Sequence, residues 1–107
     1  RLIVKKLRKK LPQTKVLVLA IFPRGGGDDD GARQTNMKVN ELISDIGDGK
    51  MVHYLNINEV FLNGRRLRQN LIPDGSHPNQ QGYAAWAKAM EPHLAKLLGE
   101  EPLISAD

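Results

Sequence analysis

Residues 16–22 read Val-Leu-Val-Leu-Ala-Ile-Phe, an unbroken apolar run that Pro23 closes. A run of this kind, β-branched in part, predicts a strand covered on both faces, as in parallel sheets. Residues 51–57 (Met-Val-His-Tyr-Leu-Asn-Ile) predict a second strand. Between the two, residues 33–46 predict a helix that Gly47 ends, because apolar residues recur there at helical spacing: Val39, Leu42, Ile43 and Ile46. Strand, helix and strand in this order predict a right-handed βαβ unit with parallel pairing.

Two further helices flank this unit. Ile3, Leu7 and Leu11 recur every four residues among lysines, which predicts the last part of an amphipathic helix stopped by Pro12. After a loop over residues 58–76, a final helix is expected over residues 79–98, with Pro92 kinking or splitting it. Its apolar stripe is Ala87, Met90, Leu94, Leu97 and Leu98. The expected order of elements is αβαβα.

Two strands of the buried type make an incomplete sheet. Their four faces and two long edges exceed what three helices can cover, and unpaired strand edges need neighbours. The sequence therefore predicts half of an α/β sandwich, completed by a partner chain, by exchange of elements between two copies, or by a missing N-terminal half. The chain starts at Arg1 without Met, which we interpret as a cut inside a larger protein.

Composition limits the other classes of protein. The chain has 107 residues, 40% of them hydrophobic and 26% charged, as in one compact domain. It has no Cys, which excludes disulfides and thiol chemistry. No apolar run reaches the roughly 18 residues of a membrane span. The net charge of +4 comes from the first ten positions, whereas a nucleic-acid site needs basic groups continuing over one face. We therefore expect no nucleic-acid partner and no membrane span.

The segment Asp74-Gly75-Ser76-His77-Pro78-Asn79 carries the chemistry. An Asp and a His three residues apart, in a loop entering a helix, can place the carboxylate against one imidazole nitrogen. The other nitrogen is then free to act as a base. The alternative is a helix cap with His77 as a bystander, because Asp, Ser and Asn are all favoured at helix starts.

Residues 12–99 resemble the C-terminal half of SGNH hydrolases, the GDSL esterase and lipase superfamily, and most closely their platelet-activating-factor acetylhydrolase-like branch. The resemblance lies in "LPQTKVLVLAIFPRG", "VNELI", "VHYLNINEVFL" and above all "LIPDGSHPNQQGYAAWAKAMEPHL". It implies a flavodoxin-like three-layer α/β/α sandwich, of which residues 1–107 would be the C-terminal portion of one domain. It also implies that Asp74 and His77 are the acid and base of a Ser-His-Asp triad. Substrates in the family are small acyl esters, often acetyl esters of lipids or carbohydrates, and no metal or cofactor is required.

The nucleophile of the family is missing from the sequence. Neither the Gly-Asp-Ser motif nor the Gly and Asn of the oxyanion hole occurs in its family context. Ser44 falls in a predicted helix, Ser105 lies in the tail, and Ser76, next to His77, is expected to cap the last helix. We therefore predict a fragment of a serine esterase that is inactive alone. The alternative is a non-catalytic assembly or interaction module that keeps half of the esterase fold. A third interpretation is that the basic residues 1–10 bind anionic membranes or nucleic acid.

The remaining candidate residues have structural interpretations. Residues 28–31 (Asp-Asp-Asp-Gly) suggest calcium, but the twelfth position counted from Asp28 is Val39 rather than the required Glu. His53 is expected to be a strand residue with a hydrogen-bonded ring and His93 a surface residue, since no His pair has zinc-ligand spacing. Tyr83 and Trp86 could line an acyl pocket, but core packing is the expected role.

Overall fold

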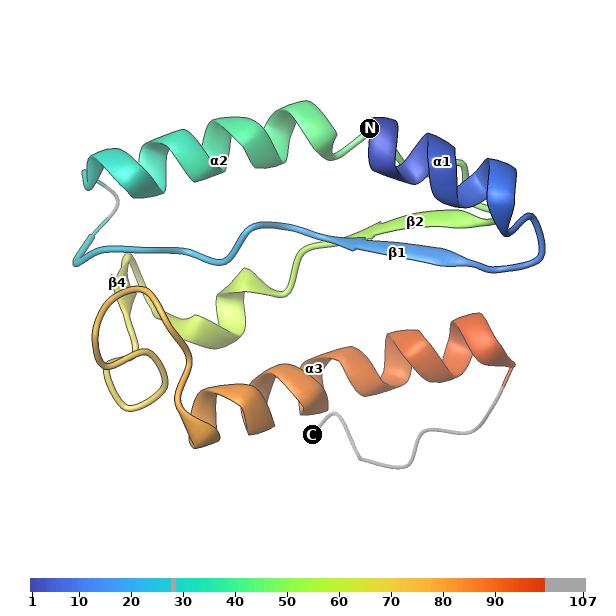
Figure 1. Ribbon diagram of the computed structural model, residues 1–107. Helices are drawn as coiled ribbons and strands as arrows, with labels where there is room; N and C mark the ends of the chain where they lie inside the picture. Colours follow the sequence, from blue (N-terminus) through green and yellow to red (C-terminus); the bar gives the residue numbers. More distant parts are fainter. Residues whose placement is uncertain (28, 100–107) are drawn as a thin grey trace.

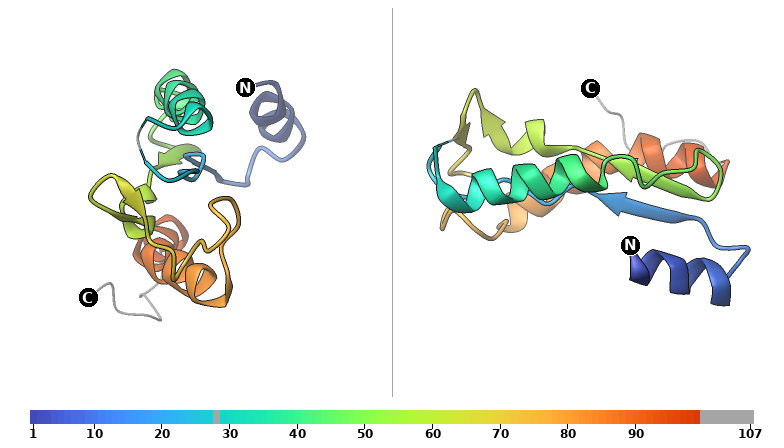
Figure 2. Two further views of the ribbon diagram at one scale, coloured as in Figure 1. Left: turned by 90° about the vertical axis from the view of Figure 1, so that its left-hand side faces the viewer. Right: turned by 90° about the horizontal axis from the view of Figure 1, so that it is seen from above.

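The computed structural model describes residues 1–27 and 29–99, and within them the chain forms three layers (Figure 1). The middle layer is a parallel sheet of β1 (Val16–Leu19) and β2 (Val52–Leu55). Helix α2 (Gly31–Ile43) lies on one side of the sheet and α3 (Gln80–Leu98) on the other. Helix α1 (Leu2–Lys10) lies on the side of α2, beyond the open edge of β1 (Figure 2). The predicted α/β class and the parallel pairing are confirmed.

Strand β1 ends at Leu19, before the end of the predicted run, and side-chain amides of Asn40 and Asn58 bind the backbone beyond it. Val16 pairs with Val52 and Leu19 with Leu55. Beyond Ala20, the backbone of Ile21 is bound on both sides by one amide: its N–H donates to Asn40 Oδ1 at 2.7 Å and its carbonyl accepts from Asn40 Nδ2 at 3.0 Å. The chain is therefore held in place after β1, although the ladder to β2 has ended.

Helix α2 departs from the prediction at both ends. It begins at Gly31, where Asp30 caps it by accepting the N–H of Arg33 at 3.0 Å. It ends at Ile43 with Ser44 as its C-terminal cap, so the predicted stop at Gly47 is wrong. Gly47 instead lies close to β2, since a Cβ there would be 3.2 Å from the carbonyl oxygen of Val52.

The buried face of α2 is also different from the predicted apolar stripe. Leu42 is 71% exposed, and the buried residues are Arg33 and Asn40. Seven residues are close to two full helical turns, so these two polar side chains lie on one face of the helix. Leu42 is about 100° around the helix from Ile43, which takes it out of the buried sector.

The segment predicted as a loop over residues 58–76 contains ordered elements. It holds a 3₁₀ turn, η1 (Asn58–Phe61), and a small antiparallel hairpin of β3 (Leu62–Asn63) and β4 (Arg66–Leu67). A cluster of buried apolar residues lies here: Phe61, Leu67, Leu71 and Ile72, with Phe22 and Trp86 packed against them. The rings of Phe22 and Phe61 are 4.7 Å apart, and Trp86 meets Phe22 edge-on. The core therefore supports the segment that leads into α3.

Helix α3 is capped by Asn79 and runs without a split through Pro92. Its predicted stripe is only half-buried, and Ala87 and Leu98 are exposed. The buried residues are Gly82 and Ala95. Gly82 has a packing reason, because a Cβ at this position would lie 2.4 Å from the carbonyl oxygen of Leu71. Only glycine lets the first turn of α3 approach that backbone so closely.

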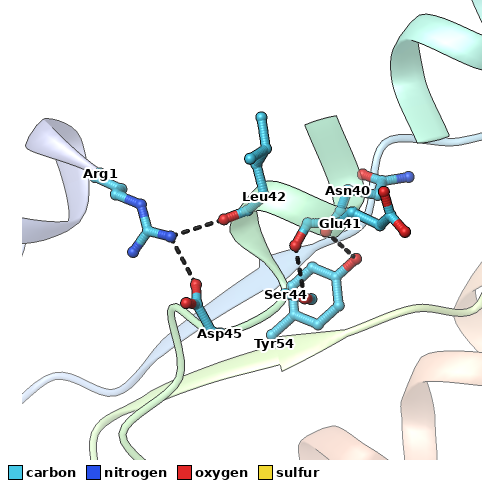
Figure 3. Close-up of polar contacts among 7 residues, drawn as sticks. All are labelled: Arg1, Asn40, Glu41, Leu42, Ser44, Asp45 and Tyr54. Carbon is cyan, nitrogen blue, oxygen red and sulfur yellow. Dashed lines mark hydrogen bonds and ion pairs between the residues drawn. The ribbon is translucent and has the colours of Figure 1, made fainter. Parts of the chain in front are cut away.

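Arg1, the residue before helix α1, connects this end of the chain to the end of α2. Arg1 Nη2 donates to the carbonyl of Leu42 at 2.7 Å and to Asp45 Oδ1 at 2.6 Å (Figure 3). In the same region, the hydroxyl of Tyr54 donates to the Asn40 carbonyl. None of the residues of α1 is buried, and Leu2 and Ile3 are 79% and 76% exposed. The predicted helix is confirmed, but its apolar residues have little cover within the described part of the chain.

The turn before β2 depends on Asp48. Its Oδ1 accepts the backbone N–H groups of Lys50, Met51 and Val52 at 2.8, 2.8 and 3.0 Å. These bonds, of which that from Val52 contributes most, lower the pKa of Asp48 from 3.8 to about 2. Because the pKa is lower in the folded chain, the stabilisation is complete above pH 3.8 and is lost as the pH falls toward 2.

We predict that Asp48→Ala lowers the melting temperature of the chain at neutral pH, and that this difference shrinks as the pH falls below 3.8. Circular dichroism melts across that pH range measure it. Asp29→Ala, at an exposed acid in another loop, serves as the control and should change the melting temperature little. An equal loss for Asp48→Ala at neutral and acidic pH would contradict the prediction.

Candidate active site

The segment between the hairpin and α3 is pinned at both of its ends. The Asn79 N–H donates to the carbonyl of Leu71 at 2.9 Å, and Asn79 Nδ2 donates to the carbonyl of Asn70 at 2.9 Å. Asn79 Oδ1 accepts the N–H of Gly82 at 2.9 Å. Leu71 and Ile72 are buried in the apolar cluster. Residues 70–71 and residue 79 are therefore held together, and residues 73–78 form a short projecting loop between them.

Asp74 and His77 are hydrogen-bonded to each other within this loop. His77 Nδ1 lies 2.8 Å from Asp74 Oδ2. The other carboxylate oxygen, Oδ1, accepts the backbone N–H groups of Ser76 and His77 at 2.8 and 2.7 Å. With Nδ1 as the donor to the carboxylate, Nε2 is the imidazole nitrogen left to face outward. The arrangement can present an unprotonated Nε2 to a hydroxyl group.

Both members of the pair are open to solvent, with 81% of the His77 side chain and 57% of the Asp74 side chain exposed. The hydrogen bond from the His77 ring, followed by the backbone N–H groups of His77 and Ser76, holds the pKa of Asp74 far below its ordinary value of 3.8. Asp74 is therefore an anion throughout the neutral range, as an orienting carboxylate must be.

The prediction that Ser76 caps the last helix is wrong, and Ser44 lies at the end of α2. Ser76 does not cap α3, since Asn79 does so, and its hydroxyl oxygen accepts a hydrogen bond from Arg24 Nη2 at 2.9 Å. Ser44 closes α2, and its hydroxyl donates to the carbonyl of Glu41. Ser105 lies outside the described residues.

Two residues that the sequence did not single out connect to the site from α2. Asn40 fixes Ile21, as described above, and Arg33 donates to the carbonyls of Arg24 and Gly25 at 2.8 and 2.9 Å. Both side chains bind the backbone of other segments, which leaves no periodic pattern in the sequence. Gly25 in turn donates its N–H to the carbonyl of Gly75 at 3.1 Å. The loop after β1 is therefore joined to the loop of Asp74 and His77.

A cleft of about 780 Å³ lies beside this loop. One wall holds Asp74 and Gly75, and the hairpin side contributes Arg66, Arg68 and Asn70. His77 belongs to the same loop but does not line the cleft. The structure therefore places a polar, partly basic cavity next to the carboxylate of the pair.

The other candidates take structural positions. Trp86 packs against the core cluster, in agreement with the expected role, whereas Tyr83 is 53% exposed. The ring of His53 is hydrogen-bonded through Nε2 to the carbonyl of Lys50 at 3.1 Å, and His93 is exposed, as expected for both. Of the predicted acidic loop, Asp28 lies outside the described residues and Asp30 caps α2. In the described ranges, no three His, Cys, Asp or Glu residues come together as metal ligands. No helix there is long and apolar enough to cross a membrane.

The described residues thus form an α/β layer with parallel strands and a hydrogen-bonded Asp–His pair in the loop before the last helix. Residues 1–85 match the GDSL-like Lipase/Acylhydrolase family, and the chain belongs to that family. It is 28% identical over 101 residues to platelet-activating factor acetylhydrolase IB subunit alpha1 from Pongo abelii, and 27% identical to the protein of the same name from Homo sapiens. Both alignments cover 92% of this chain and 43% of the relative, so the chain spans less than half of their length.

The fold has a counterpart among solved structures. A protein from Streptococcus pneumonia, provisionally described as a platelet activating factor, superposes with a TM-score of 0.67 at 17% sequence identity. The match covers 86% of this chain and 47% of that protein. The expected resemblance to the acetylhydrolase-like branch is confirmed by these relatives, and the solved structure supports the fold.

We predict that His77→Ala raises the pKa of Asp74 but leaves it below 3.8, because the backbone N–H groups of residues 76 and 77 still donate to the carboxylate. A carboxyl ¹³C NMR titration measures it, and His93→Ala, at an exposed histidine, is the control. Since the pKa of Asp74 is lowered by folding, the pair stabilises the fold above pH 3.8 and less as the pH falls. An unchanged pKa of Asp74 in His77→Ala would contradict the hydrogen-bonded pair.

Proposed function

We propose that this chain is the C-terminal part of a serine esterase that hydrolyses small acyl esters, of the acetyl type, of lipids or carbohydrates. In this proposal Asp74 and His77 are the acid and base of a Ser-His-Asp triad. The nucleophilic Ser belongs to a segment outside residues 1–107. The observation that carries the proposal is the contact of 2.8 Å between His77 Nδ1 and Asp74 Oδ2, which leaves Nε2 free.

The proposed roles follow from that orientation. His77 Nε2 takes the proton of the Ser hydroxyl as the oxygen attacks the ester carbonyl, and later gives this proton to the leaving alcohol. Asp74 keeps the proton on Nδ1 in the neutral ring and stabilises the imidazolium that forms. Its low pKa supports this role, because the carboxylate stays charged while the imidazole gains and loses its proton.

A second segment is needed to complete the sheet in this proposal. Among the described residues the main sheet has two strands, and β1 pairs on one side with β2. The residues of β1 are only half-buried, and α1 exposes Leu2 and Ile3. We propose that a missing N-terminal half covers these groups in the complete enzyme. In the isolated chain a second copy does so, by edge pairing or by exchange of terminal helices around a two-fold axis.

We predict that this chain acquires esterase activity when it is joined to the segment encoded upstream of Arg1, and that this segment carries a Gly-Asp-Ser block. In the active complex, His77→Ala should reduce kcat by several orders of magnitude because no other group takes the Ser proton. Asp74→Asn should reduce it less, since the backbone also orients the loop. Hydrolysis of p-nitrophenyl acetate measures both.

Two controls accompany this experiment. The chain alone should hydrolyse the ester no faster than a His-containing peptide, and His93→Ala should retain the activity of the complex. Near-normal rates for His77→Ala would contradict the role of His77 as the base and leave this loop with a structural role only. An upstream segment without a Gly-Asp-Ser block would favour the alternative of a non-catalytic assembly module, for which the exposed apolar residues of α1 provide a surface.

We also predict that the isolated chain is a dimer or larger assembly at micromolar concentration. Leaving large apolar side chains uncovered forfeits about 1.5–3 kcal/mol each, which is a large share of a net stability of about 5–15 kcal/mol. Ile3→Glu should weaken the assembly, whereas Lys6→Glu on the same exposed helix should not. Light scattering measures the mass. A compact wild-type monomer with sharp cooperative melting would refute this prediction.

A further inference from the structure

Arg33 is the one buried charged residue within the described ranges, with 3% of its surface exposed. It stands in the first turn of α2, but its guanidinium is bonded to segments outside that helix. Nε donates to the carbonyl of Arg24 at 2.8 Å and Nη2 to the carbonyl of Gly25 at 2.9 Å. Nη1 donates to the carbonyl of Arg65, in the turn of the β3–β4 hairpin. One side chain thus fastens the loop after β1 and the hairpin to the start of α2.

The loop that Arg33 holds makes two contacts with the loop of Asp74 and His77. The N–H of Gly25 donates to the carbonyl of Gly75 at 3.1 Å. Arg24 Nη2 donates to Ser76 Oγ at 2.9 Å. Gly75 and Ser76 are the two residues between the acid and the base of the pair. A displacement of residues 24 and 25 would therefore be transmitted to the peptide groups that set the distance between Asp74 and His77.

The backbone at Gly25 shows how closely this loop is packed. Its φ is +77°, and a Cβ there would lie 2.2 Å from Asp30 Cγ, so the loop is folded back on the capping residue of α2. A buried guanidinium is tolerated only where acceptors meet its N–H groups. The three carbonyls must therefore stay turned toward Arg33, which restricts the loop to this position.

We propose that Arg33 is a positioning residue for the Asp74–His77 pair, which it holds in hydrogen-bonding geometry by fixing residues 24 and 25 beneath Gly75 and Ser76. Arg33 itself does not touch the pair. The alternative is a purely structural role in anchoring the start of α2. The catalytic consequence rests on the proposed function, whereas the geometric one can be measured in the chain without any reaction.

The test is Arg33→Lys, which keeps the charge but cannot span three carbonyls, since its single ammonium lacks the planar fork. Long-range ¹H–¹⁵N spectra of the histidines at about pH 8, where imidazoles are neutral, report the tautomer of each ring. In the wild type we expect His77 to carry its proton on Nδ1. In Arg33→Lys we expect His77 to shift to the tautomer mixture of a solvated ring while His53 and His93 are unchanged. Arg1→Lys, which alters a guanidinium–carbonyl bond at the other end of α2, should leave all three rings unchanged.

A folded Arg33→Lys chain in which His77 keeps the Nδ1–H tautomer would overturn the proposal, as would a wild-type chain without that tautomer. If Arg33→Lys fails to fold, the wild type is followed in increasing sub-denaturing urea. The Arg33 Nε–H, the Gly25 amide and the Nδ1–H tautomer of His77 should then lose protection together. Retention of the tautomer after the Arg33 Nε–H exchanges freely would overturn the proposal.

Kinetics of the complemented enzyme separate this inference from the proposed function. Arg33→Lys should lower kcat by about 10²-fold with KM nearly unchanged, because misplacing a catalytic base costs rate rather than binding. A normal kcat in Arg33→Lys would overturn the positioning role. If the wild-type complex is inactive while the tautomer responds as expected, the proposed function fails and the positioning of the pair stands.

Discussion

Burying the guanidinium of Arg33 is the constraint on which the rest of this structure depends. The charge is out of water, so carbonyls from the loop after β1 and from the β3–β4 hairpin must converge on it. Gly25, whose carbonyl is one of these acceptors, has a positive φ and lies against the capping residue Asp30. Residues 24–33 and the β3–β4 hairpin consequently meet next to the Asp74–His77 loop.

The parts of the fold that the sequence predicted are those with local or periodic signals. The apolar runs identified both strands, and Asn79 and Pro12 marked helix ends within one or two residues of those observed. The spacing of Asp74 and His77 allowed a hydrogen-bonded pair but left a helix cap open, and the resemblance to SGNH hydrolases favoured the pair. The cap of α3 was not predicted correctly, because Asp, Ser and Asn are all favoured at helix starts. The structure has Asn79 in this position.

The parts that could not be predicted are held by polar groups that bind backbone from distant segments. Asn40 pairs with Ile21 and Arg33 with residues 24, 25 and 65, and neither contact produces a periodic pattern. The hairpin strands are two residues long, too short for alternation to be detected. Gly47 was predicted to end the helix, but in the structure it lies beyond the helix and close to the carbonyl of Val52.

The buried residues of this chain support the acid and base of the proposed triad, but not its nucleophile or oxyanion donors. The site loop is supported by the chain itself, because Leu71 and Ile72 are buried beside Phe61 and the acid and base lie three residues apart. The nucleophile and the oxyanion donors must come from another part of the protein, because they require a different strand-to-helix turn. Loss of a single oxyanion donor raises the activation free energy by about 2.7–4 kcal/mol. His77 is also 81% exposed, so water competes for its free nitrogen. The completing segment of the proposal must therefore do two things at once: bring the Ser hydroxyl to Nε2 and cover the ring from solvent.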